Sequence, residues 1–289
     1  MKSILLAFLL VTGAEAAEML VCGWDEVMIL DLAKDAENPP VVWRWSAAQA
    51  AELPEVYKTK FRTTDDCKAV AGNRILITAS SDGVALVDRA TKKTSFYGQC
   101  ANAHSAELLP GERIAVACSV REKGGNRLAV FDAKTPEREI FSTELYSGHG
   151  VVWDEERKTL WALSGRDLRA YSLDRWESET PALRLVQSFP LPTGGGHELL
   201  PIPGTADLAV TTVRDVYRFN RERQEFSPHS VLQGQPNIKS LSYQGPDGPV
   251  VYTQAEKPNW WTDKIRMLQP STTIVRPGEK IYKVRWIPR

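Results

Sequence analysis

The sequence lacks the features that most directly assign a protein to a class. Beyond its N-terminus, no stretch is apolar for the roughly 18 residues that a membrane-spanning helix requires. It has no glycine-rich phosphate loop, nucleophile elbow, HExxH motif or CxxC motif. Lysine plus arginine equals aspartate plus glutamate at 36 residues each, so no overall field attracts nucleic acid or an anionic membrane. We therefore expect any partner to be recognised locally.

Cysteine is also scarce. The chain has four, at positions 22, 67, 100 and 118. A core of this size does not need covalent staples, so these residues are not a disulfide framework. One bridge between Cys100 and Cys118 is possible, but buried free thiols are the simpler interpretation.

The first 17 residues have the pattern of a secretory signal peptide. Lys2 precedes an apolar run over residues 4–11, and small residues lead to a cleavage point near Ala16 or Ala17. This run is too short to span a bilayer in a mature protein. We predict an exported monomer, periplasmic or extracellular, in which residues 18–289 form one domain. The alternative is an ordinary buried N-terminal helix.

A strand-turn-strand pattern recurs about every 40–50 residues. Its clearest copy is residues 147–171, where three apolar runs are separated by two charged turns. Similar units start near residues 66, 103, 196 and 238, and several third strands end in aspartate, although the WD-type signature is not at the usual offsets. Four short antiparallel strands in a unit of this length are typical of a propeller blade.

The two ends of the chain supply one further blade. The first unit lacks an inner strand, and residues 281–286 form a lone strand. We therefore predict an all-β, six-bladed β-propeller with four-stranded antiparallel blades, whose ring is closed when the C-terminal strand completes the first blade. Residues 46–59 form a helical insert. A two-sheet sandwich would not explain the repeat, and a wound α/β fold would require long amphipathic helices.

Propeller geometry gathers residues that are distant in sequence. The first residues of each innermost strand should lie at one rim of the central channel, and three of the four histidines occupy this position in their units. The six predicted rim residues are Lys68, His104, His149, His197, Lys239 and Lys283. The full predicted ligand-binding set beside the histidines is Lys68, Lys239, Lys283, Asp66, Glu107, Glu198, Trp260, Trp261, Arg166 and Arg214.

The three histidines are the candidate catalytic and metal-binding residues. Neutral imidazoles at this radius could hold one divalent metal ion or transfer protons, and the lysines could bind a ligand carboxylate. Alternatively, each histidine caps a blade turn by bonding to neighbouring backbone.

Two other predictions concern aromatic residues and the fourth histidine. Trp260 and Trp261 could stack on a sugar, although one of them could instead pack between blades, as we expect for Trp153 and Trp161. His229 is expected at the surface, far from the axis.

Several motifs resemble a known family. AHSAELLPGERIAVA, SGHGVVWDEERKTLWAL, GGGHELLPIPG, PNWWTDKIRMLQP and IYKVRWIP are similar to segments of a family of exported bacterial six-bladed propellers whose function is uncharacterised. The resemblance implies the fold over nearly all of the mature chain and supplies no activity.

A more remote resemblance concerns the ring of histidines. It is similar to the metal site of oligogalacturonate lyases, where three histidines and a glutamine hold manganese. His104, His149 and His197 would match the three histidines, whereas lysines stand where a glutamine is expected.

Three functions remain open on the sequence. The first is a lyase or hydrolase that acts on an acidic sugar, with a metal ion or with the histidines as proton carriers. The second is a binding module for a glycan or small anionic ligand at the channel mouth. The third is a scaffold whose propeller face binds another envelope protein.

Overall fold

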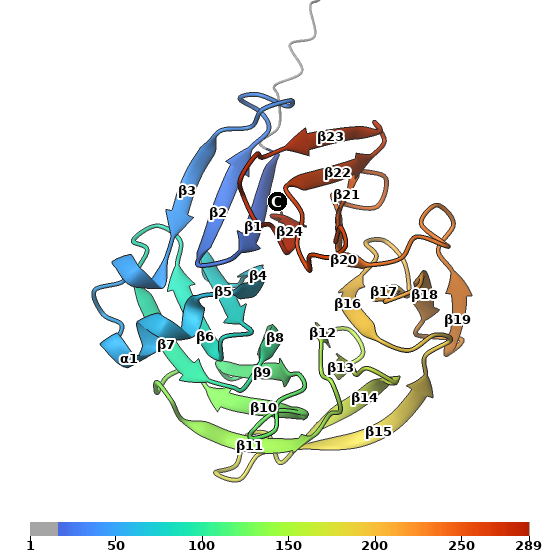
Figure 1. Cartoon of the computed structure of the whole chain (residues 1–289). Helices are drawn as coiled ribbons and strands as arrows, with labels where there is room; N and C mark the ends of the chain where they lie inside the picture. The colour runs from blue at the N-terminus through green and yellow to red at the C-terminus, as the bar shows by residue number, and fades with distance from the viewer. Residues whose placement is uncertain (1–16, 289) are drawn as a thin grey trace, which may run out of the picture.

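The fold is a closed ring of six antiparallel sheets. The computed structural model describes residues 17–288, so the predicted signal peptide lies, except for its last residue, outside the described part of the chain. Each sheet has four strands, and the sheets surround a central axis (Figure 1). The predicted all-β, six-bladed propeller is confirmed. No helix within residues 17–288 is long and apolar enough to cross a membrane.

The first three blades, written from the axis outward, have the following strands. The first is β24 (Lys283–Trp286), β1 (Glu18–Gly23), β2 (Glu26–Asp31) and β3 (Val41–Trp45); the second is β4 (Thr64–Val70), β5 (Arg74–Ala79), β6 (Gly83–Asp88) and β7 (Thr94–Gln99); the third is β8 (Ala103–Leu109), β9 (Arg113–Cys118), β10 (Arg127–Asp132) and β11 (Glu139–Glu144).

The other three blades follow the same order. The fourth is β12 (Gly150–Asp154), β13 (Thr159–Leu163), β14 (Asp167–Asp174) and β15 (Ala182–Pro190); the fifth is β16 (Gly196–Pro201), β17 (Asp207–Thr212), β18 (Val216–Asn220) and β19 (Glu225–Pro228); the sixth is β20 (Ile238–Tyr243), β21 (Val250–Gln254), β22 (Lys264–Leu268) and β23 (Thr272–Val275). The predicted insert is three short helical turns, η1 (Ala47–Gln49), α1 (Glu55–Lys58) and η2 (Thr59–Phe61).

The C-terminal strand closes the ring as predicted. β24 pairs antiparallel with β1, with Trp286 opposite Met19 and Lys283 opposite Cys22. The first blade therefore combines the two ends of the described chain, and its inner strand comes from the C-terminus (Figure 1). β24 thereby covers the inner edge of β1, which would otherwise be unpaired at the junction of the ring.

The middle strands supply most of the buried apolar residues, because neighbouring blades cover their faces. Trp161 illustrates this packing, since its ring lies 5.4 Å from that of Phe219 in the next blade. Trp153 is only partly buried and packs in the cluster between the third and fourth blades. Both tryptophans therefore take the predicted place between blades.

Two predictions about individual side chains need revision. His229 is not a surface residue: it is 5% exposed, and its Nε2 lies 2.9 Å from the Tyr243 hydroxyl. It is buried because the chain from the fifth blade to the sixth folds over it, and two backbone N–H groups donate to its Nδ1. Cys100 and Cys118 form a disulfide, whereas Cys22 and Cys67 are buried free thiols.

Candidate functional site

A β-bulge at the same point of the innermost strands builds the mouth of the channel. In four blades the register shifts by one residue there, which leaves one residue outside the ladder. In the fourth blade the His149 N–H donates to the carbonyl of Leu163, which is paired with Gly150. In the first blade the Tyr282 N–H donates in the same way to the carbonyl of Cys22, which is paired with Lys283. Because a bulge re-aims its side chain, six equivalent residues ring the mouth. They are Asp65, His104, His149, His197, Lys239 and Tyr282.

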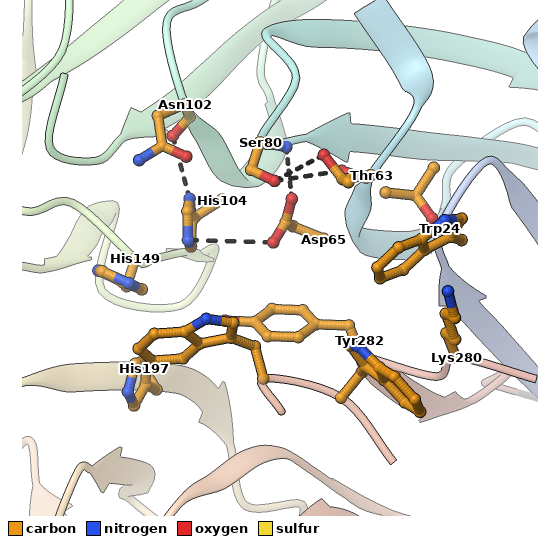
Figure 2. A pocket seen from close by; sticks show the side chains of 13 residues that line it. Trp24, Thr63, Asp65, Ser80, Asn102, His104, His149, His197, Lys280 and Tyr282 are labelled. Atoms are coloured by element: carbon orange, nitrogen blue, oxygen red, sulfur yellow. Dashed lines mark hydrogen bonds and ion pairs between the residues drawn. The ribbon is translucent and has the colours of Figure 1, made fainter. Parts of the chain in front are cut away.

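Neighbouring members of this ring are in contact. The ring centroids of His104 and His149 lie 4.3 Å apart, and those of His149 and His197 lie 5.0 Å apart. Lys239 Nζ is 2.9 Å from His197 Nε2. His104 Nε2 is 3.9 Å from a carboxylate oxygen of Asp65 (Figure 2). The predicted convergence of the three histidines is thus observed.

Backbone carbonyls fix the tautomers of two histidines. His104 Nδ1 lies 3.0 Å from the Asn102 carbonyl, and His149 Nδ1 lies 2.8 Å from the Ser147 carbonyl. Because a carbonyl only accepts, each Nδ1 carries the proton, and each Nε2 is left as an acceptor. His197 has the same tautomer for a different reason: its Nε2 accepts from Lys239, which leaves the proton on Nδ1, and this buried Nδ1 has no hydrogen-bond partner within the described residues.

Burial favours the neutral form of the three histidine side chains at the mouth. It lowers the pKa of all three imidazoles, most strongly those of His149 and His197, and the neighbouring imidazoles and Lys239 add to this effect. Burial, followed by the charge of Lys283, also lowers the pKa of Lys239 to about 8. Burial raises the pKa of Asp65. The three imidazoles are therefore neutral at pH 7.

The bulge ring opens into a cavity of about 470 Å³. Its walls also carry aromatic residues and a lysine from the loops above. The lining residues are Trp24, Thr63, Thr64, Asp65, Ser80, Asn102, His104, His149, His197, Trp260, Trp261, Lys280 and Tyr282 (Figure 2).

Aromatic rings form one wall and part of the rim. Trp24 and Trp261 pack edge to face with their centroids 6.1 Å apart, and Lys280 Nζ lies 3.9 Å from the Trp24 ring. Trp260 is 72% exposed, and its ring lies 5.4 Å from Lys239 Nζ. Both residues of the 260–261 pair border the cavity, and Trp261, the less exposed of the two, packs against Trp24 of the first blade.

Two of the predicted rim positions were misassigned. The residues equivalent to the histidines are Asp65 and Tyr282, not Lys68 and Lys283. Lys283 is 1% exposed and stands one residue beyond the bulge, 3.4 Å from Glu198. Lys68 lies further along β4, where its Nζ donates to Glu107 and to the Val151 carbonyl. For Lys283 the physical reason is the extra residue at the mouth, which leaves the apolar pattern unchanged. Lys68 lies three residues beyond Asp65, which is more than one extra residue explains.

The remaining predicted residues separate into two groups. Asp66 and Glu198 are buried below the ring, where both bind Arg285. Arg166 and Arg214 do not border the cavity, and Arg166 lies over the Tyr146 ring instead. The sequence reasoning missed Lys280 and Tyr282. The sequence could have indicated Tyr282, because Tyr282 stands directly before the first paired residue of its inner strand, Lys283, as His104 stands directly before Ser105.

The geometry does not fit the predicted metal centre. Within residues 17–288, no group of three or more His, Cys, Asp or Glu side chains is placed to hold a metal ion. The imidazoles pack edge to face, at 65° and 81°, and His197 Nε2 is occupied by the ammonium of Lys239.

Comparison with known proteins gives a family but no activity. The family described as "Family of unknown function (DUF6528)" matches residues 21–288. No curated protein matches the chain.

Proposed function

The chain belongs to this family of unknown function, DUF6528, and from the geometry of the mouth we propose that the protein binds a carbohydrate, or a similar small polar ligand, in the cavity above the bulge ring. As the leader pattern indicates, we also propose that it does so as an exported monomer. The observation that carries the proposal is the presence, in one cavity, of open tryptophan faces and fixed hydrogen-bond acceptors.

The tryptophans suit the apolar faces of a sugar ring. Trp260 is 72% exposed and Trp24 is 42% exposed, so much of the surface of both side chains is available to a ligand. Large aromatic side chains on the rim of a cavity gain free energy when a flat apolar surface covers them. Sugar rings present such C–H surfaces. A bound sugar ring could therefore cover the tryptophan surface that the protein itself leaves exposed.

The opposite wall suits hydroxyl groups. His104 Nε2 and His149 Nε2 are acceptors whose protons are held on the other nitrogen, and the hydroxyls of Thr63 and Ser80 lie on the same cavity. Both Nε2 atoms face the cavity, so each can accept a hydrogen bond from a donor that enters it. Sugar hydroxyls are donors of the required size.

Direct titration tests the proposal. Isothermal titration calorimetry with monosaccharides and short oligosaccharides, neutral and acidic, should detect binding. Trp260→Ala should weaken it at least about tenfold, since covering a large exposed aromatic side chain contributes roughly 1.5–3 kcal/mol. Tyr146→Ala is the matched control, because Tyr146 is an exposed aromatic residue outside the cavity. If no sugar binds, or if both variants act alike, the proposal fails and a protein-binding scaffold becomes the better explanation.

A further inference from the structure

Lys280 is the single lysine or arginine among the described residues that line the mouth cavity. Its Nζ lies 3.9 Å from the centre of the Trp24 ring and 5.5 Å from that of Trp261. None of the ion pairs among residues 17–288 includes it, and the adjacent Glu279 pairs with Arg276 at 2.7 Å. Lys280 therefore presents a positive charge that aromatic faces hold in place and no carboxylate neutralises.

The other lysines near the axis already have partners in the protein. Lys68 is bound to Glu107, and Lys239 donates to His197. Lys283 lies beneath the ring, between Asp66 and Glu198. None of these three borders the cavity, so the predicted binding of a carboxylate by these residues would require the histidine ring to open.

We propose that the ligand is a sugar bearing one acid group, and that Lys280 selects it by binding this group at the Trp24–Trp261 wall. The inference rests on the proposed function and adds the ligand's charge and orientation. Figure 2 shows Lys280 and Trp24 on one side of the cavity and His149 and His197 on the other. The sugar hydroxyls then face the imidazoles.

The two walls are not interchangeable for an anion. An acid group placed at the histidine wall would meet the acceptor atoms of His104 and His149 and the nearby Asp65, whereas Lys280 offers only donors. A lysine ammonium is a compact point charge without the planar fork of arginine, so it accepts a carboxylate or a sulfate equally well. The shared chemistry is thus an anionic group on a pyranose ring.

Matched probes separate charge from ring shape. Binding of glucuronate and galacturonate would be compared with binding of their methyl esters, which keep the ring and lose the charge, and glucose 6-sulfate would distinguish sulfate from carboxylate. Wild-type protein should bind at least one acidic probe about tenfold or more tightly than its uncharged counterpart. Raising the sodium chloride concentration from 0.05 to 0.5 M should reduce this preference, because salt screens exposed charge.

Two substitutions assign the preference to Lys280. Lys280→Gln should reduce it to about twofold or less, while binding of the methyl esters stays unchanged. Lys280→Arg should restore the preference, because it keeps the charge. An acid preference that survives Lys280→Gln, or wild-type protein that binds ester and acid equally, overturns the inference. In the second case, loss of all binding in Trp260→Ala would leave the proposed function standing. If no probe binds the wild type, both fail.

Discussion

The protonation state of each histidine side chain decides whether the mouth accepts or donates hydrogen bonds. His104, His149 and His197 lie side by side in a buried ring, and a second proton on any of them would sit beside Lys239 or Lys283. Burial and these neighbours make the neutral forms the stable ones. Neutral imidazoles can accept hydrogen bonds from hydroxyl groups at pH 7, whereas imidazolium ions could only donate.

These histidines should make the protein sensitive to acid. Burial lowers the pKa of all four histidines, that of His229 to about 4. Histidines in the unfolded chain have a pKa of about 6.5, so below this pH they bind protons that the native histidines do not bind. Stability therefore falls as pH falls. Between pH 7.5 and 5.5, the free energy of unfolding should decrease by about 3–5 kcal/mol, at up to about 1.4 kcal/mol per histidine per pH unit. The raised pKa of Asp65 opposes this change in part.

Urea unfolding at a series of pH values measures this slope. His149→Gln should reduce it by close to one proton, since glutamine does not titrate. Arg223→Ala, which alters an exposed ion pair with Glu225, should leave it unchanged. Stability that stays constant from pH 7.5 to 5.5, or an equal slope in His149→Gln, would show that the histidines are not held neutral.

At the scale of strands, hydropathy predicted the architecture because most middle strands are largely apolar and polar turns separate them. The pattern also placed His104, His149 and His197 correctly, since each directly follows the turn that starts its unit. It failed at Lys283 because a bulge shifts side-chain direction by one residue and leaves no trace in hydropathy. The error at Lys68 is larger, since this residue lies three positions beyond the rim residue Asp65. Lys280 was missed for a different reason, because its position depends on the contact of two loops far apart in sequence.

At the start of the fifth blade, the backbone of Gly196 lies close to the carbonyl of Ser164 in the fourth blade. A Cβ at Gly196 would lie 2.6 Å from the Ser164 carbonyl oxygen and 2.8 Å from Leu163, whereas a Cβ at Gly194 would find its nearest neighbour at 3.6 Å. Gly196→Ala should therefore cost about 1–3 kcal/mol of stability by overpacking, and it should weaken ligand binding by displacing His197. Gly194→Ala should change either quantity little. Thermal unfolding and titration calorimetry measure the two effects, and equal behaviour of the two variants would contradict this account of the bulge.

Across the whole molecule, one guanidinium joins three blades below the mouth. Arg285, on the closing strand β24, binds Asp66 of the second blade and Glu198 of the fifth, at 2.7 and 3.0 Å. All three side chains are buried. Burial alone would raise the pKa of Asp66, but Arg285 and Lys283 hold it well below its usual range. The strand that closes the ring is thereby fixed across the axis as well as along its edge.

Arg285→Met should therefore destabilise the ring far more than its size suggests. Removing one partner leaves two carboxylates buried with only Lys283 beside them, and such a loss costs about 3–5 kcal/mol. The triple variant Arg285→Met, Asp66→Asn, Glu198→Gln removes the uncompensated charge and should recover most of this free energy. Urea unfolding at pH 7.5 measures both variants, with Arg223→Ala as the exposed-pair control, expected within about 0.5 kcal/mol of wild type. If the triple variant is no more stable than Arg285→Met, the arginine holds the ring by packing and not by charge.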